Sequence, residues 1–488
     1  MPETNRGVEP LAVAAAVADK GLKPNAISFL SNLVIGVASA APAYSLASAL
    51  GTIAGIAAFG TPGVMIVAFV PMLCIATAYF YLNRADPDCG TTFAWAARSM
   101  GPHMGWIGGW ALTVTNILVM PSLAVIAGQY SFQLLGLGEP STLAVTLVGV
   151  AWIVLMTAIC YSGIELSART QQVLLGTELA ILLIFAALAL VHVYGANPPA
   201  ASAHIAAGWF DPLTAGNLDT ITEALLVAVF IYWGWDSSLS VNEETENPET
   251  APGRAAILST FLLLGLYVFV AASALAFAGP ALLSANKADI FAPIGQTVLG
   301  AWLGKLLILA VLTSASAATQ TTILPAARTA LSMAAAGAIP ARFGEINPRF
   351  QSPGFATLAM GAVSIVWYVG LTLVSKNVLD DSLLALGLPI AFYYALTGFA
   401  CAIYYRRDIA TGVRNFMLMG VIPVTGALMM VFLFIKSCFT LAHSGSSTFF
   451  GIGAPAVIGV GSLLAGLPLM MMARVNAPGF FSGEKQLE

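Results

Sequence analysis

The stretch Tyr232-Trp233-Gly234-Trp235-Asp236-Ser237-Ser238 interrupts a long apolar segment with a glycine, an acid and two hydroxyls. An earlier apolar segment carries Gly36-Val37-Ala38-Ser39-Ala40-Ala41-Pro42, which places a proline deep inside it. Proline has no N–H to donate and clashes with the preceding helical turn, so it predicts a broken helix, and the polar cluster predicts a second one. Taken alone, each break is better explained as an ordinary kink with small residues for close helix packing.

The composition around these stretches excludes a water-soluble fold. Of the 488 residues, 58% are hydrophobic and only 9% are charged, whereas soluble domains carry about 25% charged residues. The mean hydropathy of +0.87 therefore indicates that lipid is the solvent for most of the chain. The net charge of −4, without a basic tract, excludes a nucleic-acid partner. The five scattered cysteines lack metal-ligand spacing, so we expect neither a metal nor a cofactor.

Twelve apolar segments are long enough to cross a bilayer as helices, which takes about 20 residues each. Their approximate limits are 27–50, 62–83, 104–134, 141–162, 168–194, 219–241, 255–279, 302–333, 354–374, 382–405, 414–436 and 450–473. Residues 1–26 contain an apolar run at 11–18 that is too short to span, with Asp19 and Lys20 directly after it. We therefore expect these residues to form a cytoplasmic tail and not a cleaved signal.

The distribution of Lys and Arg predicts the orientation. With an even number of spans and both ends inside, only Lys287, Lys305, Lys376 and Lys436 of the 19 basic residues lie outside. Basic residues concentrate in cytoplasmic loops. This bias predicts cytoplasmic termini, supports the count of twelve, and places the chain in the plasma (inner) membrane.

The two breaks fall in the first and sixth spans, the first members of two possible five-helix halves. Interrupted spans at matching positions of two halves indicate an inverted-repeat transporter with a site at mid-membrane. A broken helix frees N–H groups at the start of one half-helix and carbonyls at the end of the other. These partial charges suit a zwitterion, which has both an anionic and a cationic group.

Two stretches resemble a known family. Leu82-Asn83-Arg84-Ala85-Asp86-Pro87-Asp88-Cys89-Gly90-Thr91-Thr92-Phe93, followed by Gly101 and Gly105-Trp106-Ile107-Gly108-Gly109-Trp110, resembles the segment joining helices two and three of the amino acid–polyamine–organocation permeases. Phe230-Ile231-Tyr232-Trp233-Gly234-Trp235-Asp236, followed by Glu243-Glu244, Asn247-Pro248 and Pro252-Gly253-Arg254-Ala255, looks like their sixth helix and the next cytoplasmic loop.

The resemblance covers about residues 27–473 and implies an all-α integral membrane fold with twelve transmembrane helices. It implies a 5+5 inverted-repeat transport core at 27–405, with repeats at about 27–194 and 219–405. Two additional helices at 406–473 and a cytoplasmic tail at 474–488 follow. One departure stands out: many amino acid carriers of the family have a glycine-rich turn in the first helix, where this chain has Val37-Ala38-Ser39-Ala40-Ala41. Alanine leaves less backbone freedom than glycine.

Glu178 lies near the middle of span five among apolar residues. An ionised acid there costs roughly 2.5–3.5 kcal/mol even on the mildest insertion scale, so the side chain should face the protein interior. A carboxyl that is protonated in one access state and ionised in another would provide proton coupling. The alternative is a permanently neutral acid hydrogen-bonded to a neighbouring helix. Some proton-coupled members of the family have a lysine at this place, so their mechanism does not transfer directly.

Several polar residues have both a structural and a functional interpretation. Asp236 is interpreted first as an N-cap of the second half-helix and second as a substrate contact. The hydroxyls of span eight mostly bond to their own helix, although two of them, with carbonyls of the first break, would suit sodium. The acidic run 243–249 is expected to be a solvated face, with a salt-bridge gate to Arg84, Arg98 or Arg254 as the alternative.

Aromatic residues beside the sixth break are candidates for walls or gates, and by the resemblance Phe230 matches an aromatic gate position. Asn116, in span three, is a polar group that must find a partner and is a candidate to line the path. We expect substrate contacts from Ala38, Ser39, Ala40, Ala41, Asn116, Phe230, Tyr232, Trp233, Gly234, Trp235, Asp236 and Tyr393, and coupling-ion contacts from Glu178, Ser314 and Ser316.

The sequence therefore predicts a secondary active transporter for amino acids that works by alternating access, with a proton, or alternatively sodium, as the coupling ion. An amine or polyamine carrier, or an amino acid exchanger of the same fold, is the nearest alternative, and the missing glycine run favours the amine. A channel or a membrane enzyme is the alternative outside this class. Enzyme motifs such as GxGxxG, HExxH and GxSxG are absent from the sequence, so we do not expect an enzyme.

Overall fold

The computed structural model describes residues 20–286, 290–374, 381, 384–443, 448–449 and 451–482. Eleven helical stretches in these residues are long and apolar enough to cross a membrane. The first, Phe29–Ala85, has 57 residues, far more than the roughly 20 that one crossing needs. It turns at η1 (Ala58–Gly60), where Ala58 has a φ of 47°. This stretch therefore makes two crossings, and the twelve predicted spans are confirmed.

The twelve crossings are made by long helices, some of them in two parts: α1 (Phe29–Ser39) with α2 (Pro42–Ala57), α3 (Thr61–Ala85), α5 (Pro102–Leu135), α6 (Thr142–Tyr161), α7 (Ile164–Tyr194), α8 (Leu218–Ala228) with η4 (Phe230–Tyr232) and α9 (Ser237–Ser240), α10 (Ala251–Ala285), α12 (Lys305–Ala335), α13 (Gly354–Val374), α15 (Gly387–Tyr404), α16 (Val413–Asn415) with η8 (Phe416–Val421) and α17 (Ile422–Ala442), and α18 (Ala454–Leu464) with α19 (Gly466–Asn476).

Shorter elements connect them: α4 (Thr92–Met100), α11 (Phe291–Leu303), α20 (Pro478–Phe481), the single turns η2 (Ala207–Phe210), η3 (Pro212–Ala215), η5 (Asn242–Glu244), η6 (Ala341–Gly344) and η7 (Asp408–Thr411), and a β-hairpin of β1 (Thr448–Phe449) and β2 (Ile452–Gly453). The two strands of the hairpin pair antiparallel.

Two helices extend further than predicted. The first span continues to Ala57 instead of ending near residue 50, although it contains Gly51 and Gly55. A Cβ at Gly55 would lie 2.6 Å from the Ser284 hydroxyl of α10, so this glycine allows close helix packing and does not end the helix. α17 likewise continues past the exposed Lys436, whose long side chain can reach the membrane surface from inside a helix.

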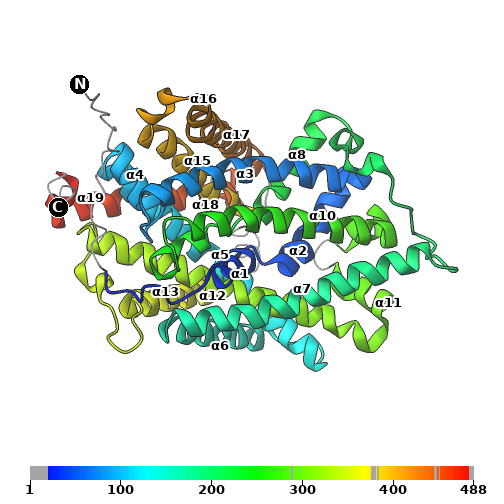
Figure 1. Ribbon diagram of the computed structural model, residues 1–488. Helices are drawn as coiled ribbons and strands as arrows, with labels where there is room; N and C mark the ends of the chain where they lie inside the picture. The colour runs from blue at the N-terminus through cyan, green and yellow to red at the C-terminus, as the bar shows by residue number, and fades with distance from the viewer. Residues whose placement is uncertain are drawn as a thin grey trace, which may run out of the picture.

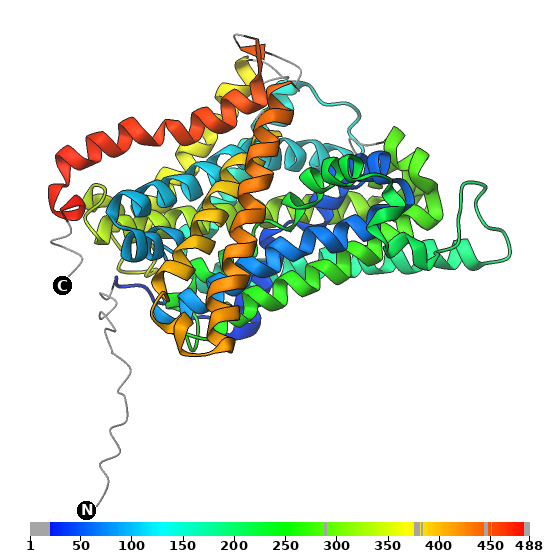
Figure 2. The same ribbon diagram turned by 90° about the horizontal axis from the view of Figure 1, so that it is seen from above.

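The two broken spans occupy the centre of the bundle. α1 packs against α7, α9, α10 and α12, and α2 packs against α8, α10 and α12. Figure 1 shows α1 and α2 in the middle of the molecule, with α10 on one side and α12 on the other. Figure 2 shows α17 and the rod formed by α18 and α19 at the periphery. α17 packs on α15 and α3, so the last two spans cover the bundle from outside.

Both ends of the described chain lie around α4. Lys20 forms an ion pair with Asp88, just before α4. At the other end of the chain, the Phe480 ring stacks on Phe93 of α4 with ring centroids 5.8 Å apart. The two ends therefore lie at the same end of the bundle, as an even number of crossings requires. The last residues of the predicted tail are part of the fold, because Lys20 pairs with Asp88 and Lys23 pairs with Glu165.

Candidate functional site

The first break is a change of backbone direction between α1 and α2. Ala41 adopts the left-handed conformation, with φ 46° and ψ 62°, and Pro42 begins α2. A residue that precedes proline is disfavoured in the helical region, and proline is well suited to the first helical position because the N–H it lacks would have no intrahelical partner. The local sequence Ala41-Pro42 therefore ends one helix and starts the next.

The sixth break brings its backbone against the first. After η4, Trp233 is extended, and Gly234 has a φ of 118°. A Cβ at Gly234 would lie 2.5 Å from the carbonyl oxygen of Ser39 and 3.0 Å from the nitrogen of Ala40. Both the backbone angle and this close approach require glycine. Gly234 is therefore the point at which the two broken spans touch.

Side chains join the two breaks on either side of this contact. The hydroxyls of Ser39 and Ser237 lie 2.7 Å apart. On the α10 side, the Tyr267 hydroxyl donates to the carbonyl of Ile231 at 2.7 Å and also lies 3.3 Å from the carbonyl oxygen of Ala40. Tyr267 thus binds the freed carbonyl ends of both spans. The sequence reasoning missed it, and the one available signal was a phenol that needs a partner inside an apolar helix.

The first break satisfies its own N–H groups. Those of Ala40 and Ala41 donate to carbonyls of the last turn of α1, and that of Ser45 donates to the Ala41 carbonyl. Ala43 donates to Oε1 of Glu178 at 2.6 Å. Pro42 has no N–H, so the one remaining N–H of this turn belongs to the residue after Ala43.

That residue, Tyr44, donates its N–H to the Ser314 hydroxyl of α12 at 3.1 Å. Glu178 and Ser314 therefore act together as a cap for α2, one from α7 and one from α12. The prediction that Glu178 faces the protein interior is confirmed, because its exposed fraction is 0%. Its second oxygen, Oε2, has no hydrogen-bond partner among the described residues.

The sixth break leaves more of its backbone free. The N–H groups of Gly234 and Trp235 have no hydrogen-bond partner in the described part of the chain. The interpretation of Asp236 as an N-cap is wrong, because its side chain makes no capping hydrogen bond to α9. Instead it accepts from the hydroxyls of Tyr394 at 2.9 Å and Tyr393 at 3.1 Å, both in α15. The physical reason is that α9 has only four residues, whereas two strong phenol donors face the carboxyl.

The other predicted site residues divide into two groups. Trp233 is half-buried, and its indole N–H donates to the Tyr393 hydroxyl. Phe230 is half-buried as well and lies over Gly387 of α15, where a Cβ would meet its ring at 2.5 Å. Around them, Ala41, Val119, Leu123 and Ala318 form an apolar cluster against which Tyr44, Trp233 and Leu386 pack. The structure thus brings Ala41, Phe230, Trp233 and Tyr393 to one place.

The second group makes packing contacts instead. Tyr232 donates its hydroxyl to the Met65 carbonyl of α3, and Trp235 is fully buried between the rings of Tyr79 and Tyr394. Asn116 donates to the Leu112 carbonyl of its own helix. Ser316 lies two residues beyond Ser314, or about 200° around the helix, so it faces away from Glu178.

The ends of the broken spans are covered in different ways. At the end away from the chain termini, the segment with η2 and η3 lies over the start of α3. A Cβ at Gly60 would meet the Ala215 backbone at 2.5 Å, and the Phe59 and Trp209 rings stack at 4.6 Å. Among the described residues, aromatic and backbone packing without an ion pair covers this side.

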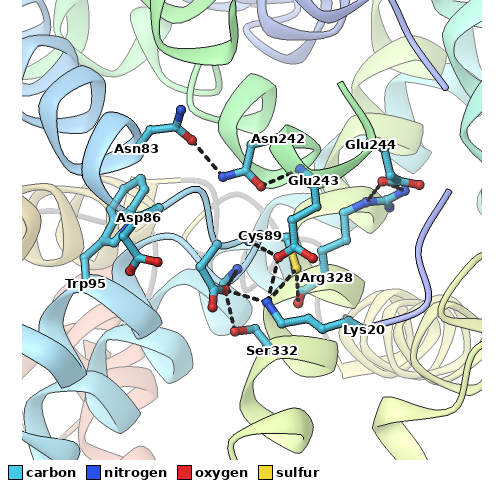
Figure 3. Close-up of polar contacts among 12 residues, drawn as sticks. Lys20, Asn83, Asp86, Cys89, Trp95, Asn242, Glu243, Glu244, Arg328 and Ser332 are labelled. Carbon is cyan, nitrogen blue, oxygen red and sulfur yellow. Dashed lines mark hydrogen bonds and ion pairs between the residues drawn. The ribbon is translucent and has the colours of Figure 1, made fainter. Parts of the chain in front are cut away.

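At the end of the bundle where the two chain termini lie, ion pairs connect neighbouring segments, as Figure 3 shows. The Lys20 ammonium lies 2.6 Å from Oε1 of Glu243 and 2.9 Å from Oδ1 of Asp88. It also lies 3.7 Å from the Cys89 sulfur. The ligand atoms of Asp88, Cys89 and Glu243 lie within 4.8 Å of one another, the spacing of a cation site. The cation held there is the ammonium of the chain itself.

Burial alone would raise the pKa of Asp88, but the Lys20 charge and hydrogen bonds from Ser332 and the Gly90 N–H outweigh it and lower this pKa. Burial would lower the pKa of Lys20, yet Asp88, Cys89 and Glu243 together raise it above its ordinary value. Both groups are therefore held in their charged forms.

A second ion pair lies beside the first. The Arg328 guanidinium of α12 contacts Oε2 of Glu244 at 2.5 Å, and both side chains are almost fully buried. Burial raises the pKa of Glu244, and the Arg328 charge opposes the shift. The expectation of a solvated acidic face is thus wrong for Glu243 and Glu244. The partners proposed in the alternative are wrong too, since Arg98 pairs with Asp86 and Asp88 instead.

Two hollows on the bundle lie away from the breaks. One of about 420 Å³ is lined by Ile117 and residues of α13, and one of about 330 Å³ lies among α3, α10 and the start of α17. Their linings are apolar and include strongly exposed side chains such as Val366, which is 72% exposed. Such surfaces are those that a membrane helix presents to lipid, so neither hollow is a candidate solute site.

A membrane protein that is helical throughout its spans, with the first and sixth spans broken at facing positions, has the architecture of a secondary transporter. A family model described as Amino acid permease matches residues 25–473, and the chain belongs to that family. This confirms the transporter class and the family that the two sequence stretches resemble.

Individual relatives are more distant. The branched-chain amino acid permease BcaP of Bacillus subtilis is 23% identical over 371 residues, covering 72% of this chain and 76% of the relative. The low-affinity putrescine importer PlaP of Escherichia coli K12 is 23% identical over 402 residues, covering 81% and 85%. An uncharacterized transporter of Mycobacterium tuberculosis H37Rv is 26% identical over 343 residues, covering 69% and 72%.

Proposed function

We propose that the protein is a secondary active permease that carries a small amine-bearing solute, foremost an α-amino acid, by alternating access with a proton as coupling ion. It works in the inner membrane with both termini in the cytoplasm, as the positions of the basic residues indicate. The observation that carries the proposal is the contact of the two breaks at Gly234, beside half-buried aromatic side chains.

The solute lies against the first break at Ala41, with Trp233 and Phe230 as its aromatic walls. Its ammonium group faces Asp236. Two phenol donors hold the carboxyl of Asp236 in a fixed orientation, in which it can bind a cation. The free N–H groups of Gly234 and Trp235 lie beside it. Of the predicted substrate contacts, Tyr232, Trp235 and Asn116 support this arrangement from outside. Tyr232 binds α3, Trp235 packs between two tyrosine rings, and Asn116 binds its own helix.

Glu178 is the proposed proton carrier. It is buried without a basic neighbour in contact and has one oxygen that no group in the described chain satisfies. Sodium is the other candidate ion, with the Ser314 hydroxyl as an oxygen ligand. Replacing sodium by choline in the transport buffer separates the two, because proton coupling predicts unchanged uptake.

The ion pairs of Lys20 and Arg328 form the gate at the terminal end. Lys20 joins the loop after α3 to the loop after α9, and Arg328 joins α12 to the same second loop. Opening toward that side requires these contacts to separate. In the described part of the chain, packing without an ion pair closes the opposite end, and it separates at a different point of the cycle.

A second candidate function is transport of an amine without a carboxylate. One observation favours it: the N–H groups of the first break, which would hold a carboxylate, already donate to Glu178 and Ser314. The similarity to a putrescine importer is consistent with such a cargo.

Counterflow into proteoliposomes tests the proposed function. Vesicles loaded with one unlabelled amino acid or amine are diluted into the labelled compound, across a panel of L-amino acids, putrescine and aliphatic monoamines. A carrier gives saturable, transient accumulation of one or a few compounds. Flux that does not saturate would indicate a channel, and chemical conversion of the label would indicate an enzyme.

A further inference from the structure

We propose that Glu178 is a tethered carboxylate that occupies the carboxylate subsite of the solute. A solute carboxylate then binds at the start of α2 only when Glu178 has taken up a proton and left that place. The inference rests on the proposed function and extends it, because it states how proton and solute are linked and which part of the solute requires the proton.

The site consists of the first donors of α2. This helix has 16 residues, and the positive end of its dipole and its free N–H groups favour an anion. The Ala43 N–H is taken by Oε1 of Glu178 at 2.6 Å, and the Tyr44 N–H by the Ser314 hydroxyl at 3.1 Å. A carboxylate from the solute would need the same two donors. The chain thus already places a carboxyl group at the donors where the solute would present its own.

A second observation points to exchange at this place. Oε2 of Glu178 is fully buried and has no hydrogen-bond partner among the described residues. Asp86 and Glu244 also have one buried oxygen without a hydrogen-bond partner, but each of them is in an ion pair with an arginine, whereas the described residues place no cation against Glu178. Oε2 of Glu178 is the atom that takes up the proton. Once neutral, the carboxyl is held less strongly by the positive end of α2.

No charged group competes for control of Glu178. The helices packed against α7 include α1, α2, α6, α10, α11 and α12, and their titratable residues are Tyr44 in α2, Cys160 and Tyr161 in α6, Arg254 and Tyr267 in α10, and Lys305 and Arg328 in α12. Of these, Tyr267 interacts with Glu178. Lys305 and Arg328 are nine and fourteen residues from Ser314, or about 13 Å and 21 Å along α12.

On α7 itself, Arg169 and His192 are nine and fourteen residues from Glu178, or about 13 Å and 21 Å along the helix axis. The charge of Glu178 therefore has no fixed countercharge beside it. An ionised Glu178 and an ionised solute carboxylate at the same donors would repel each other strongly in such surroundings. Replacing one carboxylate by the other, with one proton taken up, leaves the net charge at these donors unchanged.

The inference separates two classes of solute. An amino acid presents a carboxylate and must bind together with one proton. An amine with the same side chain but no carboxylate leaves Glu178 in place and binds without a proton. The proton is thus linked to the carboxylate of the cargo and not to transport as such.

The experiment compares each amino acid that binds with its decarboxylated amine, for example L-leucine with isoamylamine. The full-length protein in nanodiscs is titrated calorimetrically between about pH 5.5 and about pH 9, in buffers of different ionisation enthalpy. One-proton linkage predicts that, over the range in which Glu178 is ionised in the free protein, the Kd of the amino acid rises by up to about tenfold per pH unit, with uptake of about one proton. The Kd of the amine lacks this dependence, because any contribution of Asp236, which holds the ammonium of both compounds, is common to the two.

Three variants test the role of the side chain. Glu178→Ala frees the Ala43 N–H, so amino acid binding becomes independent of pH and no proton is taken up. Glu178→Gln keeps a neutral acceptor at the same donor and gives weaker, pH-independent binding. Glu165→Ala is the matched control, because Glu165 lies on the same helix but is exposed and pairs with Lys23; it keeps the wild-type pH dependence.

The inference is overturned if Glu178→Ala retains the proton uptake of the wild type, or if the amine shows the same pH dependence as its parent amino acid. The experiment distinguishes failure of this inference from failure of the proposed function. If the wild type binds amines and no amino acid at any pH, amino acid transport is wrong. The inference then still requires Glu178→Ala to gain amino acid binding, and no gain would overturn it as well.

Discussion

The first and sixth spans are both broken, yet they treat their freed backbone groups differently. In the first break every N–H between Ala40 and Ser45 donates within the protein, with Glu178 and Ser314 supplying two of the acceptors. In the sixth break the N–H groups of Gly234 and Trp235 have no partner among the described residues. The chain itself therefore occupies the donors of the first break, whereas no described residue occupies these two donors of the sixth.

The difference follows from the neighbours of each break. α2 is a helix of 16 residues with a strong positive end, and in the interior it requires an anion or another acceptor. α9 has only four residues, so it has little dipole to satisfy, and Asp236 is free to turn toward α15. The longer helix therefore requires an acceptor at its first N–H groups, whether Glu178 or a solute supplies it.

The largest expected effect is at the contact of the two breaks. In Gly234→Ala the added Cβ would lie 2.5 Å from the Ser39 carbonyl oxygen, and the backbone angle is unfavourable for alanine. We expect transport to fall by about 100-fold or more, because small displacements at a binding site have effects of this size. Gly265→Ala in α10 is the control, since nothing lies within 4 Å of its Cβ. Equal counterflow rates for both variants would show that Gly234 is not part of the binding site.

Removal of the charge at the sixth break should have the second-largest effect. Asp236→Asn keeps the shape but loses the anion that two phenols orient. Hydrogen bonds to charged groups contribute about 1.5–3 kcal/mol, so we expect solute binding to weaken by about 10- to 100-fold. Asp211→Asn, an exposed acid in front of η3, serves as the control. A Kd that is unchanged in calorimetry would show that the ammonium lies elsewhere.

The tyrosine that binds both breaks should affect stability and transport together. Tyr267→Phe leaves the buried Ile231 carbonyl without its donor, at a cost of about 1–3 kcal/mol. We expect a lower Tm and a raised KM. Tyr405→Phe removes a similar bond, to the Tyr81 carbonyl, outside the breaks, so it should lower the Tm without changing the KM. If the two variants are indistinguishable in KM, Tyr267 is only structural.

The gate is expected to give the smallest effect on transport, and it can be followed at Cys89. Burial and Glu243 raise the pKa of this thiol more than the Lys20 charge lowers it, so its alkylation is slow while the Lys20 ammonium lies against the sulfur. Lys20→Met removes the charge that lowers this pKa, but it also leaves Asp88 and Glu243 without their cation, so opening of this end should outweigh the pKa effect and accelerate the labelling by about tenfold or more. The labelling is measured in a variant in which the other four cysteines have been replaced. Unchanged labelling would mean that Lys20 does not hold this end closed.

The pH dependence of this gate has a definite sign. The pKa of Asp88 is lowered, so its contribution is complete above its ordinary value of about 4 and is lost as the pH falls through the lowered one. The pKa of Lys20 is raised, so its contribution is complete below about 10.4 and is lost only at higher pH. Cys89 labelling should therefore respond to Lys20→Met equally across the neutral range, and any change of transport there must come from another group.

The sequence contained enough information for the architecture and for the positions of both breaks. Spans appear as long apolar runs, and Pro42 and Gly234 mark the breaks because each has a backbone property that no other residue shares. The burial of Glu178 was also predictable, since a charge in a spanning helix must avoid lipid. These are local consequences of composition and conformation.

The partners of these residues could not be predicted in the same way. The acceptor of the Ala43 N–H is 135 residues away, and Lys20 is separated from Glu243 by 223 residues. Asp236 was misinterpreted because the capping rule assumes a helix of ordinary length after it. Tyr267 carries no local signal beyond its hydroxyl. Such contacts depend on how the helices pack, which the pattern along a single helix does not encode.

The most direct test of the account is an electron cryo-microscopy structure of the wild-type protein with a bound amino acid. The account predicts solute density between Ala41 and Trp233, its ammonium at Asp236, and the Glu178 side chain withdrawn from the Ala43 N–H. Solute bound away from the two breaks, or an amino acid in place with the Glu178 contact intact, would contradict it.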